Sequence, residues 1–209
     1  MPGNLAAQNT KQYLRIVGGN IVRTVDKNTE GARLREYELP NGEKGEKWEL
    51  VYMNWTGKIQ NIQFKDGEYG TSCMIDLGDA VLTLNTESRY FQDLACKLFS
   101  ADLTQEIIFH PYDIEGQDGK KKTGVSLKQD GEKLKNFFYD FDEKKSLHGF
   151  PEPDKTKKTK KTYWKIYFAE VAQFLMEKID TLQIPTAQTK DVKDVEEPAE
   201  EVALEDLPF

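Results

Sequence analysis

The chain has 209 residues, a formal net charge of −7 from 36 acidic and 29 basic side chains, and a hydrophobic share of 38%. This length suits one domain with appendages, and since no run of about 18 apolar residues occurs, no membrane-spanning helix is predicted. The start, MPGNLAAQNTK, lacks the pattern of a secretory signal. Cys73 and Cys96 form no CxxC pair, which favours free thiols in a reducing compartment over a zinc site. We therefore expect a cytoplasmic protein.

In chain order, residues 1–11 are small and polar and are expected to be disordered. Residues 12–25 are rich in β-branched side chains, and Gly18-Gly19 marks a bend, a bulge or a turn in that strand pattern. Residues 33–39 alternate in polarity, which predicts a half-buried strand, and residues 40–42 read as a turn. The N-terminal part therefore predicts a β-hairpin followed by a further strand.

The middle of the chain predicts five strands and one helix. Asn85-Thr86 offers the N-cap of that helix, which extends to about Phe99 with apolar residues on one face. The expected strands, in order, are 47–64, 69–77, 80–84, 106–115 and 123–129. Three strands, a helix and two strands are the order of a five-stranded OB-fold barrel. An immunoglobulin-like sandwich is the rival, but it would need seven evenly spaced strands.

The end of the chain predicts an appended helix and a tail. A lysine-rich run between residues 155 and 161 leads into an amphipathic helix, which Pro185 ends. Its apolar stripe is interpreted as packing surface and comprises Trp164, Tyr167, Phe168, Val171, Leu175, Ile179 and Leu182. We thus expect a mainly β protein with three parts, namely residues 1–11, an OB-fold domain with N-terminal hairpin and C-terminal helix at 12–184, and a disordered acidic tail at 185–209.

The last nineteen residues, 191–209, hold eight of the 36 acids and one of the 29 bases, so the 28 acids and 28 bases of residues 1–190 balance. All of the net charge therefore lies in the tail, which ends in the apolar tip Leu207-Pro208-Phe209. Such a segment cannot fold alone and is typical of a partner-binding tail.

Catalytic chemistry has little support in the sequence. His110 and His148 are the two histidines, and each is interpreted as structural or solvated because no nucleophile stands at a suitable spacing. Asp76 and Asp79 flank a turn; a metal site is conceivable there, but turn chemistry accounts for both. No nucleotide-binding, zinc-protease or serine-hydrolase motif occurs. We expect no enzyme, no metal and no cofactor.

Single-strand binding needs aromatic faces for bases and cations for phosphates. The β region supplies both in Tyr13, Arg15, Arg23, Arg33, Arg35, Tyr37, Lys47, Trp48, Tyr52, Trp55, Lys58, Phe64, Lys65, Tyr69 and Tyr112. From this region and the loop between the last two strands, the selected DNA-binding residues are Arg33, Arg35, Tyr37, Trp48, Tyr52, Trp55, Lys58, Tyr69, Tyr112, Lys120, Lys121 and Lys122. Alternatives stay open, because the tryptophans and Tyr52 also suit core packing and the three lysines also suit a solvated turn.

With these features the chain resembles the single-stranded DNA-binding proteins of bacteria and bacteriophages, which join an OB-fold to an acidic tail with a terminal phenylalanine. The matching residues are Glu205, Asp206, Leu207, Pro208 and Phe209. Leu207 stands where the bacterial tip usually has isoleucine, and glutamates replace part of the aspartates. The N-terminal hairpin and the late helix depart from the bacterial pattern and favour a phage-type protein.

The resemblance implies sequence-nonspecific binding of single-stranded DNA in replication, recombination and repair, in the cytoplasm of a host cell if the protein is phage-encoded. The tip at residues 205–209 would recruit a polymerase, helicase, primase or nuclease, and homo-oligomers are possible. Two alternatives remain. One is an adaptor protein without a nucleic-acid role, and the other is an RNA-binding OB protein, which residue types do not distinguish.

Overall fold

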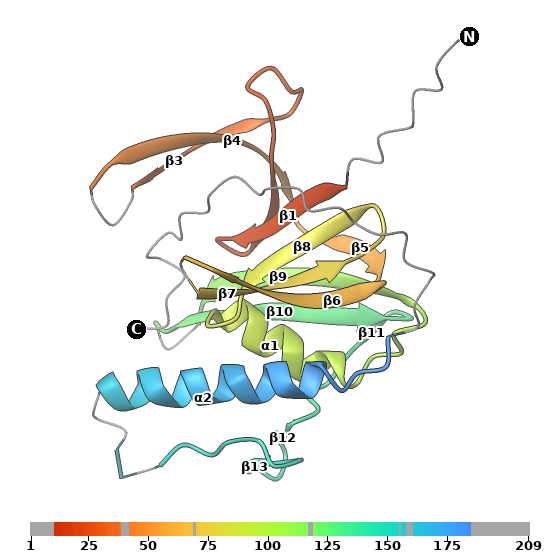
Figure 1. Ribbon diagram of the computed structural model, residues 1–209, viewed down its shortest axis with the longest axis vertical. Coiled ribbons are helices and arrows are strands. Elements are labelled where there is room, and N and C mark those ends of the chain that lie inside the picture. Colours follow the sequence, from red (N-terminus) through yellow and green to blue (C-terminus); the bar gives the residue numbers. More distant parts are fainter. Residues whose placement is uncertain are drawn as a thin grey trace.

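The computed structural model describes residues 11–38, 42–68, 70–116, 119–154, 156–157 and 161–184. Within these ranges the protein is mainly β, with two sheets, a small hairpin and two helices (Figure 1). The seven-stranded sheet contains, from edge to edge, β3 (Arg33–Glu38), β4 (Lys44–Tyr52), β2 (Asn20–Thr24), β1 (Gln12–Val17), β8 (Ala80–Asn85), β7 (Gly70–Asp76) and β6 (Asn61–Gly67). The four-stranded sheet contains β11 (Glu132–Lys133), β10 (Lys121–Gln129), β9 (Glu106–Glu115) and β5 (Trp55–Lys58).

The interruption at Gly18-Gly19 is a turn that joins β1 and β2 in an antiparallel hairpin. Both glycines have positive φ, a conformation that costs glycine little. Gly19 also lies against β9, since a Cβ there would come within 2.6 Å of the Asp113 nitrogen, and its own N–H donates to the Tyr90 hydroxyl at 2.9 Å. The turn therefore fixes the hairpin to β9 and to helix α1 (Arg89–Leu98).

The single long strand predicted over residues 47–64 is wrong. The chain forms three strands there, with breaks at Met53-Asn54 and Ile59-Gln60. β4 joins β2 and β3, β5 pairs with β9 in the smaller sheet, and β6 pairs with β7 in the larger one. Ile59 is fully buried between β5 and β6, so the bend carries the chain from one sheet to the other across the core.

Helix α1 begins later than predicted. Ser88 is its N-cap, and the Ser88 hydroxyl accepts from the Phe91 N–H at 3.2 Å. The residues expected in that role are engaged elsewhere, because Asn85 Oδ1 accepts from the Glu87 N–H and the Thr86 hydroxyl donates to the Thr71 carbonyl. From Ser88 onward the helix buries Tyr90, Phe91, Leu94, Ala95, Cys96 and Leu98.

The predicted order of three strands, a helix and two strands is present as β6, β7, β8, α1, β9 and β10, but among the described residues these strands do not close a barrel. β8 pairs in parallel with β1 instead of with β10. β10 pairs with β9 and β11. The N-terminal hairpin, expected as an addition beside a barrel, is thus hydrogen-bonded into the larger sheet.

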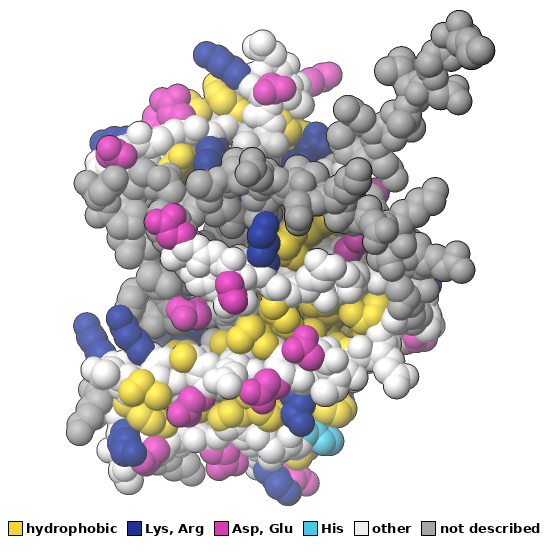
Figure 2. Space-filling model, in the orientation of Figure 1, with side chains coloured by type: hydrophobic (Ala, Val, Ile, Leu, Met, Phe, Trp, Pro, Cys, Tyr) yellow, Lys and Arg dark blue, Asp and Glu magenta, His cyan; other side chains and the backbone are white. Residues whose placement is uncertain are grey.

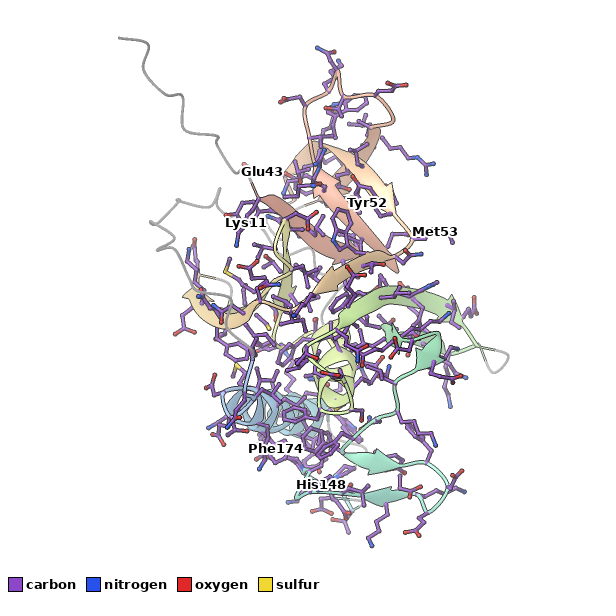
Figure 3. The ribbon with its side chains drawn as sticks, turned by 90° about the vertical axis from the view of Figure 1, so that its right-hand side faces the viewer. Lys11, Glu43, Tyr52, Met53, His148 and Phe174 are labelled. Atoms are coloured by element: carbon purple, nitrogen blue, oxygen red, sulfur yellow. The ribbon has the colours of Figure 1, made fainter. Side chains whose placement is uncertain are left out.

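Helix α2 (Lys161–Ile179) packs against α1 and ends before Pro185, which lies outside the described residues. Tyr167, Val171, Leu175 and Ile179 are buried, as the predicted apolar stripe requires. Near the small hairpin of β12 (Tyr139–Asp140) and β13 (Lys145–Ser146), Phe138 packs edge-on against Phe174 at 5.4 Å between ring centroids. Figure 3 shows Phe174 and His148 at this end of the molecule.

No helix of the described ranges is long and apolar enough to cross a membrane. Both cysteines are buried and unpaired. Burial raises the pKa of the Cys73 thiol to about 12, and burial together with the nearby Asp93 raises the pKa of the Cys96 thiol to about 12. Both side chains therefore act as core residues, in agreement with the interpretation as free core thiols.

Candidate nucleic-acid interface

Strands β3 and β4 form a ribbon that extends from the body of the molecule (Figure 1). Directly opposed residues of paired strands share a face, and neighbours along a strand point to opposite faces. The register therefore defines a basic face that carries Arg33, Arg35, Tyr37, Lys47 and Glu49. The reverse, acidic face carries Leu34, Glu36, Glu38, Lys44, Glu46 and Trp48.

An arginine neutralises the acid on the basic face. Arg35 donates from Nε and Nη2 to the two carboxylate oxygens of Glu49, both at 2.9 Å. The Glu49 side chain is only 4% exposed. Two parallel hydrogen bonds are the strong, directional form of an arginine–carboxylate pair. Because this pair is neutral overall, the remaining charges of the basic face, Arg33 and Lys47, are both positive.

Tyr37 is flanked by cations on the same face. The Arg35 guanidinium carbon lies 5.5 Å from the centre of the Tyr37 ring, and Lys47 Nζ lies 5.0 Å from it. The ring lies over the backbone of Gly45, where an added Cβ would come within 2.4 Å of the ring. Glycine thus gives the aromatic ring room to lie across the ribbon, and cations beside an aromatic ring are the elements of a single-strand site.

The basic face continues from the ribbon onto β1. Val51 of β4 lies opposite Val22 of β2, which lies opposite Arg15 of β1. Tyr13, two residues before Arg15, points to the same side of the sheet, and its side chain is 42% exposed. The sheet therefore places an aromatic residue and a cation of the N-terminal hairpin on the same surface as the ribbon's basic face.

The structure places the predicted residues Trp48, Tyr52 and Trp55 elsewhere. Trp48 is on the acidic face, where Lys27 Nζ lies 5.8 Å from its ring. Tyr52 and Trp55 contact each other edge-on at 5.1 Å and pack against the core. The Trp55 indole nitrogen is buried and has no hydrogen-bond partner among the described residues. Tyr52 is the last residue of β4, where the ribbon meets the body of the molecule (Figure 3).

Tyr112 lies beneath α1, away from the basic face. Its hydroxyl and the backbone N–H of Val125 donate to Asp93 Oδ2 at 3.2 and 2.8 Å. Burial is the main cause that raises the pKa of Tyr112 to about 12, and the Asp93 carboxylate adds to it. Tyr112 also lines a hollow of about 220 Å³ between α1, α2 and β10. These contacts give Tyr112 a structural role.

The predicted lysines lie at two further places. Lys58 of β5 pairs in register with Glu106 of β9. At the end of the β9–β10 hairpin, Lys121 Nζ is 3.0 Å from Asp113 Oδ2, and its side chain is 69% exposed. Lys120 and Lys122 are exposed beside it. The structure thus places these cations on the smaller sheet and not on the basic face.

Two groups of predicted residues lie outside the described ranges, namely Tyr69 and the partner-binding tip Glu205, Asp206, Leu207, Pro208 and Phe209. His148 and Asp76, two of the residues considered for chemistry, have structural contacts. The His148 ring stacks on Phe137 at 4.1 Å, and Asp76 pairs with Lys11 and accepts from the Gly78 N–H at 2.9 Å. Where the structure is described, no three His, Cys, Asp or Glu side chains are placed to hold a metal ion.

The sequence analysis did not separate the two faces of the ribbon. The DNA-binding residues that it selected do not include Tyr13, Arg15 and Lys47. The signal for the separation is present in RLREYE, residues 33–38, where the bases and the tyrosine occupy odd positions and the acids even ones. The contribution of β1 depends on its pairing with β2, which no local pattern reports. Figure 2 shows acidic and basic side chains intermingled over one side of the molecule, so charge is segregated only locally.

Comparison with protein-family models gives no match, and neither curated proteins nor solved structures include one with significant similarity to this chain.

Proposed function

We propose that this protein binds single-stranded DNA without sequence preference, with phosphates along the basic face and a base stacked on Tyr37. The observation that carries the proposal is a tyrosine beside two cations on one face of a ribbon whose other face is acidic. A flexible single strand brings phosphates and bases to such a surface together. The segregation of charge also gives the ribbon a preferred side for a polyanion.

The free energies expected for single stacking and phosphate contacts are small, so binding would depend on several contacts that add along a strand. A base stacked on an aromatic side chain is worth about 1–3 kcal/mol. For single strands, each phosphate contact adds about 0.7 to the slope with which the logarithm of the affinity falls against the logarithm of the salt concentration. Because residues 1–190 have no net charge, the attraction must be local, and it should weaken strongly with salt.

The strand order supports an OB-type arrangement for this function. β5 and β6 together correspond to one bent strand that enters both sheets, and it pairs with β7 on one side and β9 on the other. Helix α1 follows β8, as in the OB order. In this proposal the arrangement is an open variant, in which β1 takes the place beside β8 and brings its own residues to the binding surface.

The acidic tail supports a role in replication, recombination and repair. Residues 191–209 hold a net charge of −7 and end in an apolar aromatic tip. An apolar pocket with a basic rim on a polymerase, helicase, primase or nuclease would recognise that chemistry. The resemblance to phage and bacterial single-strand-binding proteins implies this role and the cytoplasm of a host cell as the location.

The experiment is a fluorescence-anisotropy titration of labelled oligothymidylate, with duplex DNA and oligouridylate as the other arms. Binding to the single strand should be tighter than to the duplex, and the RNA arm measures the preference between DNA and RNA. Equal affinity for single strand and duplex would refute the proposal.

A matched pair of variants tests the basic face. Lys47→Gln and Lys44→Gln each remove one lysine from β4, on opposite faces. Lys47→Gln should weaken binding and lower the salt slope by about 0.7, whereas Lys44→Gln should leave both unchanged. Equal effects of the two substitutions would exclude the basic face as the binding surface.

A further inference from the structure

We propose that the bound strand crosses the larger sheet from β3 toward β1, and that Tyr13 provides a second stacking position. This inference rests on the proposed function and extends its site beyond the ribbon to the N-terminal hairpin. It assigns a binding role to a strand that, in the predicted fold, stands outside the OB-type unit.

The pairing of β1 gives the first reason. The sheet order β3-β4-β2-β1 places the two tyrosines three strand spacings apart on one surface. Arg15 lies opposite Val22, so the register, continued by two residues, brings Tyr13 beside Thr24. Thr24 lies opposite Glu49, which lies opposite Arg33. Tyr13 and Arg33 thus belong to one row of residues across the sheet.

The spacing gives the second reason. Three steps between neighbouring strands separate β1 from β3 by about 14 Å, at about 4.8 Å each. Tyr37 lies four residues beyond Arg33 along β3, or about 13 Å at about 3.3 Å per residue. The two rings are therefore roughly 20 Å apart along a flat sheet. A strand that engages both must span several nucleotides, which fits site sizes of about 4–16 nucleotides.

The charges along this path give the third reason. Arg15 and Arg33 lie on the path, and the two acids of the same surface are paired, Glu49 with Arg35 and Asp76 with Lys11. A phosphate backbone between the tyrosines would therefore meet cations and neutralised acids. Val51 lies in the interval and, at 39% exposed, offers apolar contact to sugars and bases, whereas Val22 is buried.

Phe141 illustrates why exposure alone does not make a stacking position. Its side chain is 70% exposed at the β12–β13 hairpin, where Tyr139 contacts it edge-on at 4.9 Å. Asp140, Asp142 and Glu143 surround it in sequence, and they would repel phosphates. Phe141 therefore serves as the control aromatic for the experiment.

The test compares Tyr13→Ala, Tyr13→Leu and Phe141→Ala with the wild-type full-length chain, by titration of oligothymidylates of about 4 and about 16 nucleotides. With the longer probe, Tyr13→Ala and Tyr13→Leu should each lower affinity about 5- to 150-fold, the equivalent of one lost stacked base. Phe141→Ala should have no effect. Since leucine keeps apolar volume but has no ring face, it separates stacking from packing.

Probe length and a second tyrosine complete the design. The short probe is at the lower limit of the range of site sizes and reaches both positions only when fully extended, so Tyr13→Ala should affect it less than the long probe. With the long probe, the losses from Tyr13→Ala and Tyr37→Ala should add, as they do for distant sites. A folded Tyr13→Ala or Tyr13→Leu variant with wild-type affinity for the long probe would overturn the inference.

The two proposals fail in different ways. If Lys47→Gln and Tyr37→Ala weaken binding and the Tyr13 variants do not, the strand binds the ribbon alone and the path to β1 is wrong. If the wild-type chain does not bind the long probe at all, the proposed function and this inference are both wrong. Circular dichroism of each variant checks that it is folded.

Discussion

Asp93 shows how one side chain fixes a helix to a sheet. Its Oδ2 atom accepts from Lys97 Nζ at 2.6 Å, from the Val125 N–H at 2.8 Å and from the Tyr112 hydroxyl at 3.2 Å. Gly124 is required beside it, since a Cβ there would come within 2.3 Å of that oxygen. These contacts join α1 to β9 and β10, and they explain why Tyr112 stabilises the fold where the sequence predicted a base-stacking residue.

The raised pKa of Tyr112 makes stability sensitive to alkaline pH. The folded protein keeps the Tyr112 proton up to about pH 12, whereas the group in the unfolded chain loses it near 10.0, the ordinary pKa of a tyrosine. The folded state therefore binds more protons between these values, and the free energy of unfolding must fall as pH rises from about 10 to about 12. Tyr112→Phe removes this group and should reduce that fall; a part should remain, because the pKa values of the buried Cys73 and Cys96 thiols are also raised to about 12.

Urea unfolding at a series of pH values checks this prediction. The variant should be less stable at neutral pH, because the hydrogen bond to Asp93 is lost, and its curve should approach that of the wild type as pH rises. An unchanged slope between about pH 10 and pH 12 would show that Tyr112 is not the responsible group.

Among the elements, α1 depends on its cap. The Ser88 hydroxyl binds the Phe91 N–H, one of the four N–H groups that a helix leaves without a partner at its start. Ser88→Ala should lower the free energy of unfolding by about 1 kcal/mol. Glu87→Ala, at the exposed neighbouring position, is the control and should change it by less than about 0.5 kcal/mol. Thermal and urea unfolding measure both, and equal losses would argue against the cap.

The β3–β4 ribbon depends on Gly45 for its surface shape. Gly45→Ala places a methyl group within 2.4 Å of the Tyr37 ring. The ring is the free end of a side chain and can move aside, so the fold should be retained while the stacking surface is lost. We expect weaker oligothymidylate binding, of the order of the 5-fold or more lost with one stacked base. Gly67→Ala, where the added Cβ meets only the Gly70 oxygen at 3.5 Å, is the control.

Most elements could be predicted from local pattern, and the errors lie where local patterns compete. The predicted strand 106–115 matches β9, and RLREYE forms β3, because alternation and β-branched residues specify a strand directly. Asn85, Thr86 and Ser88 are all good cap residues. Contacts with Thr71 and Glu87 decide among them, and a sequence does not show such contacts.

At the scale of the whole molecule, mainly β architecture with two helices was predictable, but the pairing of strands was not. β1 and β8 are separated by more than sixty residues. Their parallel pairing occupies the edge of β8 with which β10 would have to pair to close a barrel. Nothing in either strand's own pattern distinguishes the two partners, since both present apolar residues at alternate positions. The candidate surface was the feature least predictable from the sequence, because its course across β3, β4, β2 and β1 follows from those pairings.

The charge of the whole molecule leads to a last prediction, on the tail. Residues 191–209 hold a net charge of −7 and are tethered to a body whose charges balance. If the basic face binds DNA as proposed, a tethered polyanion would be at high effective concentration for that face and would compete with DNA for it. Truncation after Lys190 should therefore raise affinity for oligothymidylate at low salt, and the gain should shrink as added salt screens the charges.

The control for truncation is a full-length chain whose residues 191–209 are shuffled, which keeps the charge and changes the order. If competition is electrostatic, the shuffled tail should match the wild type in DNA affinity at every salt concentration, while recruitment of a partner through Leu207-Pro208-Phe209 should be lost. A truncated chain that bound DNA less tightly would instead place the tail within the binding site. The two variants together separate the charge of the tail from the identity of its tip.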